Sequence, residues 1–172
     1  MSDVIYLRPM DPPITAEEVL RSVDYVDGCF NLHRVDWVHS FLSADGGRLM
    51  CWYQAPDAES ARLALRDIGS DMRAVWPCRV LGGVAPQSPE VSRAGVLAEV
   101  SLGDGYDGGD DEIERRLGLG DDDSACRFAF LTNRRDRLIC LLEGEAPDGA
   151  RDFLGQAGLV PADAWSCTVV TP

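Results

Sequence analysis

Two side chains of the types that transfer protons, His39 and Glu143, lie in or beside apolar segments of the sequence. An imidazole and a carboxylate that share an apolar cavity perturb each other's pKa values, which suits them to general acid/base catalysis. We therefore interpret His39 and Glu143 as catalytic candidates, with Gln54 as a group that orients them or the substrate. Two alternatives stay open: a core histidine with satisfied hydrogen bonds beside a carboxylate that reaches water, and a metal ligand.

A metal site would draw on few imidazoles, because the chain contains two histidines, His33 and His39. Under this alternative both are ligands, with Asp36 as a third. The six cysteines form no Cys-x-x-Cys pair, so the spacing of a zinc knuckle or a thioredoxin-type site is missing. We expect them to be thiols, and we expect Cys51 to be inert on a face that packs under helices.

The sequence contains an internal repeat with an offset of 89 residues. Residues 37–51, WVHSFLSADGGRLMC, match residues 126–140, CRFAFLTNRRDRLIC, without a gap. Residues 75–78 match residues 164–167 at the same offset. Agreement at both ends of a segment predicts two copies of one unit. We place the copies at residues 1–83 and 95–172, with a linker at 84–94.

Each copy is predicted to have elements in the order βαββαβ, which is typical of a ferredoxin-like unit. In the first copy, Thr15 and Glu18 form a capping box that opens a helix to about Asp27, and Asp57 caps a second helix. The predicted fold class is therefore α+β, as two tandem ferredoxin-like units.

Strand alternation assigns the side chains of each predicted hairpin to two faces. In the first copy, His39 falls on an aromatic face with Trp37 and Trp52, whereas Ser40 and Cys51 fall on the other face. The face of smaller side chains suits packing under helices. The aromatic face needs a cover, and two sheets stacked as a pseudo-dimeric α+β barrel would provide it. The expected ligand contacts in the resulting cavity are Tyr6, Trp37, Phe41, Trp52, Gln54, Phe128, Phe130 and Leu141.

The formal net charge of −13 disfavours nucleic acid and anionic membrane surfaces as partners. No apolar run approaches the roughly 18 residues of a spanning helix, and no basic segment followed by an apolar one marks a secretory signal. We expect a cytoplasmic protein that is a monomer or a weak homodimer. Acidic Gly/Asp loops at 103–111 and 120–124 do not follow the calcium-loop pattern, and their role stays open.

The first copy resembles a known family through two segments. These are residues 37–41, WVHSF, and residues 51–57, CWYQAPD. They are similar to the domain-of-unknown-function 4242 family, some members of which are labelled nickel-binding proteins. The resemblance spans about residues 4–81. It implies a ferredoxin-like fold, dimers for single-domain members, and a tandem chain similar to a fused dimer. Gln54 stands where the family pattern has Glu, which Glu143 keeps in the second copy.

Together these features predict a small-molecule enzyme or ligand-binding protein for a partly apolar metabolite. No redox-cofactor motif is present, so we expect no cofactor and favour proton-transfer chemistry such as isomerisation, cyclisation or elimination. One alternative is a protein that binds nickel or another transition metal through His33 and His39. A second alternative is a non-catalytic interaction module.

Overall fold

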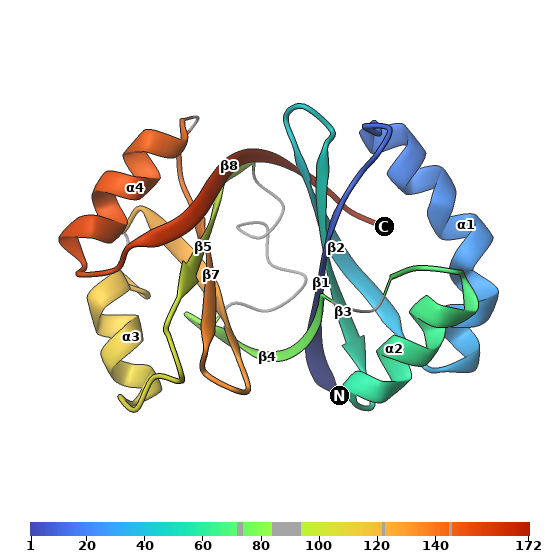
Figure 1. Ribbon diagram of the computed structural model, residues 1–172, viewed down its shortest axis with the longest axis horizontal. Coiled ribbons are helices and arrows are strands. Elements are labelled where there is room, and N and C mark those ends of the chain that lie inside the picture. Colours follow the sequence, from blue (N-terminus) through green and yellow to red (C-terminus); the bar gives the residue numbers. More distant parts are fainter. Residues whose placement is uncertain (72–73, 84–93, 122, 145) are drawn as a thin grey trace. The chain divides into compact units, whose positions relative to one another are not determined.

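The structure is a computed structural model that describes residues 1–71, 74–83, 94–121, 123–144 and 146–172. Nearly all of the predicted linker at 84–94 lies outside these ranges, as does Asp122 of the predicted loop at 120–124. The chain divides into two compact units (Figure 1). Unit one consists of residues 1–78 and 168–172, and unit two of residues 79–167.

Unit one contains an antiparallel sheet with the strand order β4-β1-β3-β2, and both of its helices pack on one face of that sheet (Figure 1). Its elements are β1 (Ser2–Pro9), α1 (Ala16–Leu32), β2 (Asp36–Ser43), β3 (Arg48–Ala55), α2 (Ala58–Asp67) and β4 (Val75–Leu81), whose last residues belong to unit two.

Unit two repeats this element order and has the strand order β8-β5-β7-β6. Its elements are β5 (Gly95–Ser101), α3 (Asp110–Leu117), β6 (Cys126–Thr132), β7 (Arg137–Leu142), α4 (Pro147–Gln156) and β8 (Pro161–Val170), whose last residues belong to unit one. The predicted mixed α+β class is confirmed. The joining of the two units into one barrel stays a prediction.

Local capping signals start both helices of unit one as predicted. The Thr15 hydroxyl accepts a hydrogen bond from the Glu18 backbone N–H at 3.3 Å, and the Glu18 carboxylate accepts one from the Thr15 backbone N–H at 2.7 Å. Asp57 accepts from the Ser60 backbone N–H at 2.7 Å and caps α2. Helix α1 continues beyond the predicted end at Asp27 to Leu32.

The tight turn between β2 and β3 needs glycine at position 46. Gly46 has a φ of +71°, and a Cβ there would collide with the backbone oxygen of Ile14. The backbone N–H of Ile14 donates to the Gly46 carbonyl at 3.0 Å. This contact holds the segment before α1 against the hairpin turn.

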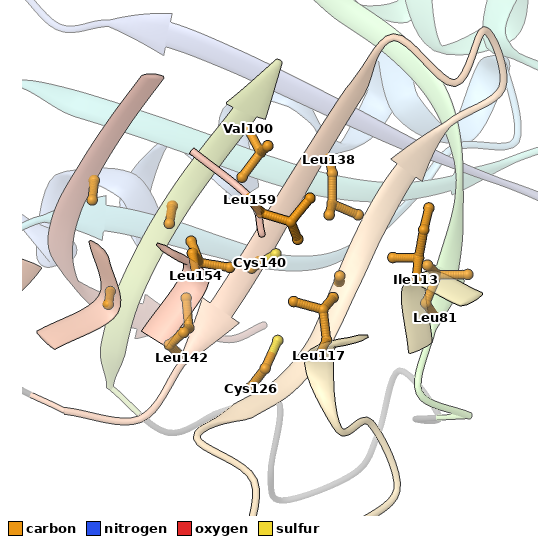
Figure 2. Close-up of a cluster of buried hydrophobic side chains, with 14 of the residues drawn as sticks. Leu81, Val100, Ile113, Leu117, Cys126, Leu138, Cys140, Leu142, Leu154 and Leu159 are labelled. Carbon is orange, nitrogen blue, oxygen red and sulfur yellow. The ribbon is translucent and has the colours of Figure 1, made fainter. Parts of the chain in front are cut away.

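Each unit has its own apolar core between its sheet and its helices. In unit two this core is made of aliphatic side chains and thiols from all of its layers, as Figure 2 shows for Ile113, Leu117, Cys126, Cys140 and Leu142. In unit one the corresponding core contains larger and more polar residues, including Tyr6, Phe30, Cys51 and Tyr53. The two copies therefore fill the same place in the fold with different chemistry.

The acidic loop at 103–111 is held by one arginine of the β6–β7 turn. Arg135 donates to the carbonyls of Tyr106, at 2.8 Å, and of Gly108. It also forms an ion pair with Asp110 at 2.6 Å, which Arg79 joins from the other side at 2.7 Å. These contacts hold the loop against the β6–β7 turn.

Candidate functional site

A β-bulge in strand β2 decides which side chains of unit one share a face. Trp37 pairs with Tyr53, but His39 pairs with the adjacent Trp52, so Val38 is an extra residue in β2. The predicted face of Trp37 is therefore wrong. A regular strand would place it with His39, whereas the bulge turns it to the face covered by the helices, beside Ser40.

A cavity of about 380 Å³ lies in unit one between helix α1 and the sheet. Val23, Val26 and Phe30 of α1 line one side of it. The sheet side carries the helix-facing residues of β1, β2 and β3, namely Tyr6, Arg8, Trp37, Ser40, Leu49, Cys51 and Tyr53. Mostly apolar walls with a few polar groups are typical of small-molecule sites.

Hydrogen-bonding groups follow one another along the sheet side of this cavity. The Trp37 indole N–H donates to the Ser40 hydroxyl at 3.0 Å, and that hydroxyl donates to the Cys51 sulfur at 3.0 Å. Burial raises the pKa of the Cys51 thiol and holds the pKa of the Tyr53 hydroxyl well above its usual range. Both groups are therefore neutral at pH 7, and Cys51 is an unreactive thiol rather than a nucleophile.

Tyr6 and Arg8 lie at alternate positions of β1 and face the same cavity. The Tyr6 side chain is 2% exposed, and burial raises the pKa of its hydroxyl, while the nearby Arg8 cation opposes that shift. The Arg8 guanidinium carbon lies 5.7 Å from the centre of the Tyr6 ring. Neither the Tyr6 hydroxyl nor the Arg8 Nε–H has a hydrogen-bond partner with good geometry among the described residues.

Unit two shows what the same sheet looks like without these polar groups. Tyr6 pairs with Cys51 and Arg8 with Leu49, whereas Ala98 pairs with Cys140 and Val100 with Leu138. At the repeat offset, Ser40 and Tyr53 correspond to Ala129 and Leu142 of unit two. The strand pairing makes Ala98 and Val100 the structural equivalents of Tyr6 and Arg8. The fold therefore does not require a polar group at any of these four positions.

His39 lies on the other face of the unit one sheet and is buried, with 7% of its surface exposed. Its ring meets the Trp52 ring edge to face, with 6.1 Å between the ring centres. Asp3, which the sequence analysis did not consider, joins this face. Its carboxylate accepts from the Trp52 indole at 2.9 Å and from the Gln54 amide at 3.3 Å. Phe41 is fully buried on the same face.

Glu143 does not lie in an apolar interior. Its side chain is 54% exposed just after the end of β7, and its carboxylate pairs with Arg127 at 3.4 Å. The predicted environment of Glu143 is therefore wrong, because β7 ends one residue earlier and the side chain reaches solvent. Phe128 and Phe130 are buried with their rings edge to face, and Leu141 is buried beside Phe128 in the register.

The residues proposed as metal ligands are not gathered into a metal site. His33 follows the last turn of α1, and its Nε2 lies 2.8 Å from a carboxylate oxygen of Asp67. This contact with His33 lowers the pKa of Asp67. His39 lies within strand β2, and Asp36 is exposed at the start of that strand. Among the described residues, no group of three His, Cys, Asp or Glu side chains could hold a metal ion.

The sequence signal for the cavity lies in the difference between the copies. Tyr6 was expected as a ligand contact, but Arg8, Ser40 and Tyr53 were not. Pairing strand 2–9 with strand 95–101 would have exposed the exchange of Tyr6 for Ala98 and of Arg8 for Val100. The ungapped repeat begins only at residue 37, so that alignment is not evident from the sequence.

Comparison with solved structures supports the α+β fold. The chain is similar to a structure titled "Crystal structure of Putative Chlorite dismutase TA0507", with a TM-score of 0.56 and 10% identity over 98% of this chain and 94% of that one. Another similar structure is titled "Crystal structure study of anthrone oxidase-like protein", with a TM-score of 0.47 and 10% identity over 99% of this chain and 90% of that one. At 10% identity the likeness to the first of these structures concerns the fold alone.

At the level of sequence families, residues 5–77 match the family described as "Nickel responsive protein SCO4226-like". This match covers most of unit one and none of unit two's own elements. No curated protein matches the chain. None of the helices in the described ranges is long and apolar enough to cross a membrane.

Proposed function

We propose that this protein binds a small, partly apolar molecule in the cavity of unit one. The observation that carries the proposal is the cavity of about 380 Å³ under α1, which falls within the range of roughly 300–1,000 Å³ typical of ligand sites. Its walls combine apolar α1 side chains with hydroxyl and guanidinium donors of the sheet.

The polar groups of this cavity make a purely structural explanation weaker. A buried donor without a partner costs on the order of 1–3 kcal/mol. Tyr6 and Arg8 each carry a buried donor without a hydrogen bond of good geometry to a described residue, whereas unit two packs the equivalent strand with Ala98 and Val100. A sequence that only needed a core here would reach greater stability with the unit two residues.

A fluorescent probe tests the proposal directly. N-phenyl-1-naphthylamine is neutral and emits strongly in apolar sites, so the wild-type protein should bind it with one saturable site. Val26 lines the cavity, and Val26→Trp should fill part of it and weaken binding about 10-fold or more. Leu32 is 75% exposed on the same helix, so Leu32→Trp is the matched control and should bind like wild type. Failure of the wild type to bind would remove the proposal.

Acid/base catalysis by His39 stays a separate prediction, with Glu143 and Gln54 in their expected supporting roles. Its support is a buried imidazole against the Trp52 ring, close in the sheet to the Asp3 carboxylate held by Trp52 and Gln54. The solvent exposure of Glu143 weakens the pair as a catalytic unit. On this proposal the reaction is a cofactor-free isomerisation, cyclisation or elimination.

Each unit is best described as ferredoxin-like, which its βαββαβ order and strand order support. The family description favours nickel as a second candidate ligand of unit one. The donor set of the described residues does not fit it, because His33 is engaged with Asp67 and no group of three donors is present. We therefore propose no reaction that uses a metal ion. A non-catalytic interaction module is the remaining alternative.

A further inference from the structure

The inner wall of the unit one cavity offers hydrogen-bond donors without acceptors. The Tyr6 hydroxyl and the Arg8 Nε–H are both buried and form no hydrogen bond of good geometry with a described residue, although Ser70 and Arg8 lie near enough to the Tyr6 hydroxyl to oppose the rise of its pKa. They lie on one strand, two positions apart, and face the same space. Two unmet donors that converge on a cavity indicate a ligand with an acceptor at that point.

The charges around the cavity point to an anionic acceptor. Arg8 forms no ion pair with a described residue, although the chain has 29 acidic residues for 16 arginines. The acidic side chains that line the cavity, Asp27 and Asp36, are both exposed, and Asp27 accepts a hydrogen bond from Asn31 at 2.8 Å. The buried end is thus positive, and the exposed mouth is negative.

The rest of the lining combines apolar side chains with neutral polar groups such as Ser40 and Ser70. Val19, Val23, Val26 and Phe30 of α1 face Leu49 and Leu65 across the cavity. Such walls gain from contact with a hydrocarbon or aromatic body and offer nothing to further charged groups. A ligand that satisfies both ends has one anionic group and an apolar remainder.

We propose that the ligand of unit one is an amphipathic monocarboxylate, whose carboxylate accepts hydrogen bonds from Arg8 Nε–H and the Tyr6 hydroxyl while its apolar body lies under α1. This inference rests on the proposed function and names its ligand class. A guanidinium with a neighbouring hydroxyl is a strong carboxylate receptor, since charge-assisted hydrogen bonds are about twice as strong as neutral ones.

Competition experiments with matched probes test this class. N-phenyl-1-naphthylamine is bound first and then displaced by decanoate or by 1-decanol, below their aggregation limits, and in a second arm by 1-naphthoate or 1-naphthalenemethanol. In at least one arm the acid should displace the probe at a concentration about 10-fold lower than its alcohol. The arm with the larger preference tells an aliphatic from an aromatic body.

Two variants assign the preference to the proposed groups. Arg8→Met should abolish the preference for the acid over its alcohol while keeping the binding of the neutral probe. Arg66→Met removes the same charge from an exposed position outside the cavity and should leave the preference intact. Tyr6→Phe removes one hydroxyl only and should lower the preference about 3-fold, which keeps the test valid where Arg8→Met does not fold.

The outcomes separate this inference from the proposed function. If the wild type binds the neutral probe but acid and alcohol displace it at equal concentrations, the proposed carboxylate class of ligand is wrong. Small-molecule binding in the cavity would still stand. A preference that survives in both Arg8→Met and Tyr6→Phe would also overturn this inference. A wild-type protein that binds no neutral probe would remove the proposed function and this inference with it.

Discussion

The Trp37 indole donates a hydrogen bond to the Ser40 hydroxyl at 3.0 Å, although residues three apart in a regular strand face opposite sides of a sheet. The extra residue Val38 accounts for this, because the bulge turns Trp37 onto the face of Ser40. The Ser40 hydroxyl then donates to Cys51 and links two strands under helix α1. One bulge thereby adds the Trp37 indole to the polar side of the cavity.

The Trp37–Ser40 bond should contribute measurably to stability. Ser40→Ala leaves the indole N–H without its acceptor and should lower the free energy of unfolding by about 1–2 kcal/mol. Urea denaturation of Ser40→Ala, Trp37→Phe and the double variant should give a coupling energy of about 1 kcal/mol. Ser101→Ala, at an exposed strand position, serves as the control and should change little. Purely additive effects would show that the bond is energetically neutral.

His39→Phe should be at least as stable as the wild type in a thermal melt. Phe128 occupies the equivalent position of unit two and is fully buried there, so the sheet accepts an aromatic ring at this site. If His39 is the acid/base, His39→Phe and His39→Ala should lower turnover by about 10²- to 10⁴-fold once a reaction is found. A variant that melts far below the wild type would instead assign His39 a structural hydrogen-bonding role.

Stability should fall as the pH rises above about 9. Burial raises the pKa of the Cys167 thiol from 9.0 to about 11. Between these values the unfolded chain has lost a proton that the folded chain keeps, so unfolding becomes more favourable with each pH step. The loss from this thiol approaches about 2–3 kcal/mol at pH 11. The raised pKa values of Cys51 and Tyr53 act in the same direction.

Urea denaturation under reducing conditions at pH 7 to 11 measures this loss. Cys167→Ala should flatten part of the decline relative to the wild type. An unfolding free energy that stays constant over this range would contradict the raised pKa values.

Arg135 should control the order of the loop at 103–109. Arg135→Met removes its bonds to two loop carbonyls and to Asp110, so limited proteolysis should cut within this glycine-rich segment faster than in the wild type. The adjacent Arg134 is exposed, so Arg134→Met serves as the matched control. Equal cleavage of both variants would show that other contacts hold the loop.

We expect that His33 and His39 do not bind nickel as a pair. His33 is engaged with Asp67, and His39 lies within the buried part of β2. Calorimetric titration of the wild type, His33→Ala and His39→Ala with nickel tests this expectation. Micromolar binding that either substitution abolishes would show that these side chains form a metal site.

Local signals in the sequence predicted the starts of both helices of unit one. Thr15, Glu18 and Asp57 act within one helical turn, so their capping bonds do not depend on distant packing. The end of α1 was predicted too early, at Asp27. The last turn instead continues because Phe30 packs edge to face on Tyr53 of β3, with 5.2 Å between the ring centres. That contact joins residues far apart in the sequence.

The candidate site was harder to predict, because its geometry depends on register. Counting turn residues gives the faces of a regular hairpin, but no local signal marked Val38 as an extra residue. The environment of Glu143 was harder to predict for a related reason, since strand β7 ends before it and its side chain reaches solvent. The cavity itself depends on how helix α1 packs on the sheet, which strand alternation does not encode.

The bulge of β2 has a counterpart in β6, where Arg127 is the extra residue between Cys126 and Phe128. The two extra residues, Val38 and Arg127, are 89 positions apart, which is the offset of the repeat. If only one copy had the extra residue, all side chains of the strand on one side of the bulge would point to the opposite face from their counterparts in the other copy. The shared position of the two bulges is the arrangement that the predicted duplication of one bulged unit would produce. The cavity groups would then have diverged on an ancestral scaffold, with one copy free to specialise while its sibling kept the sheet stable.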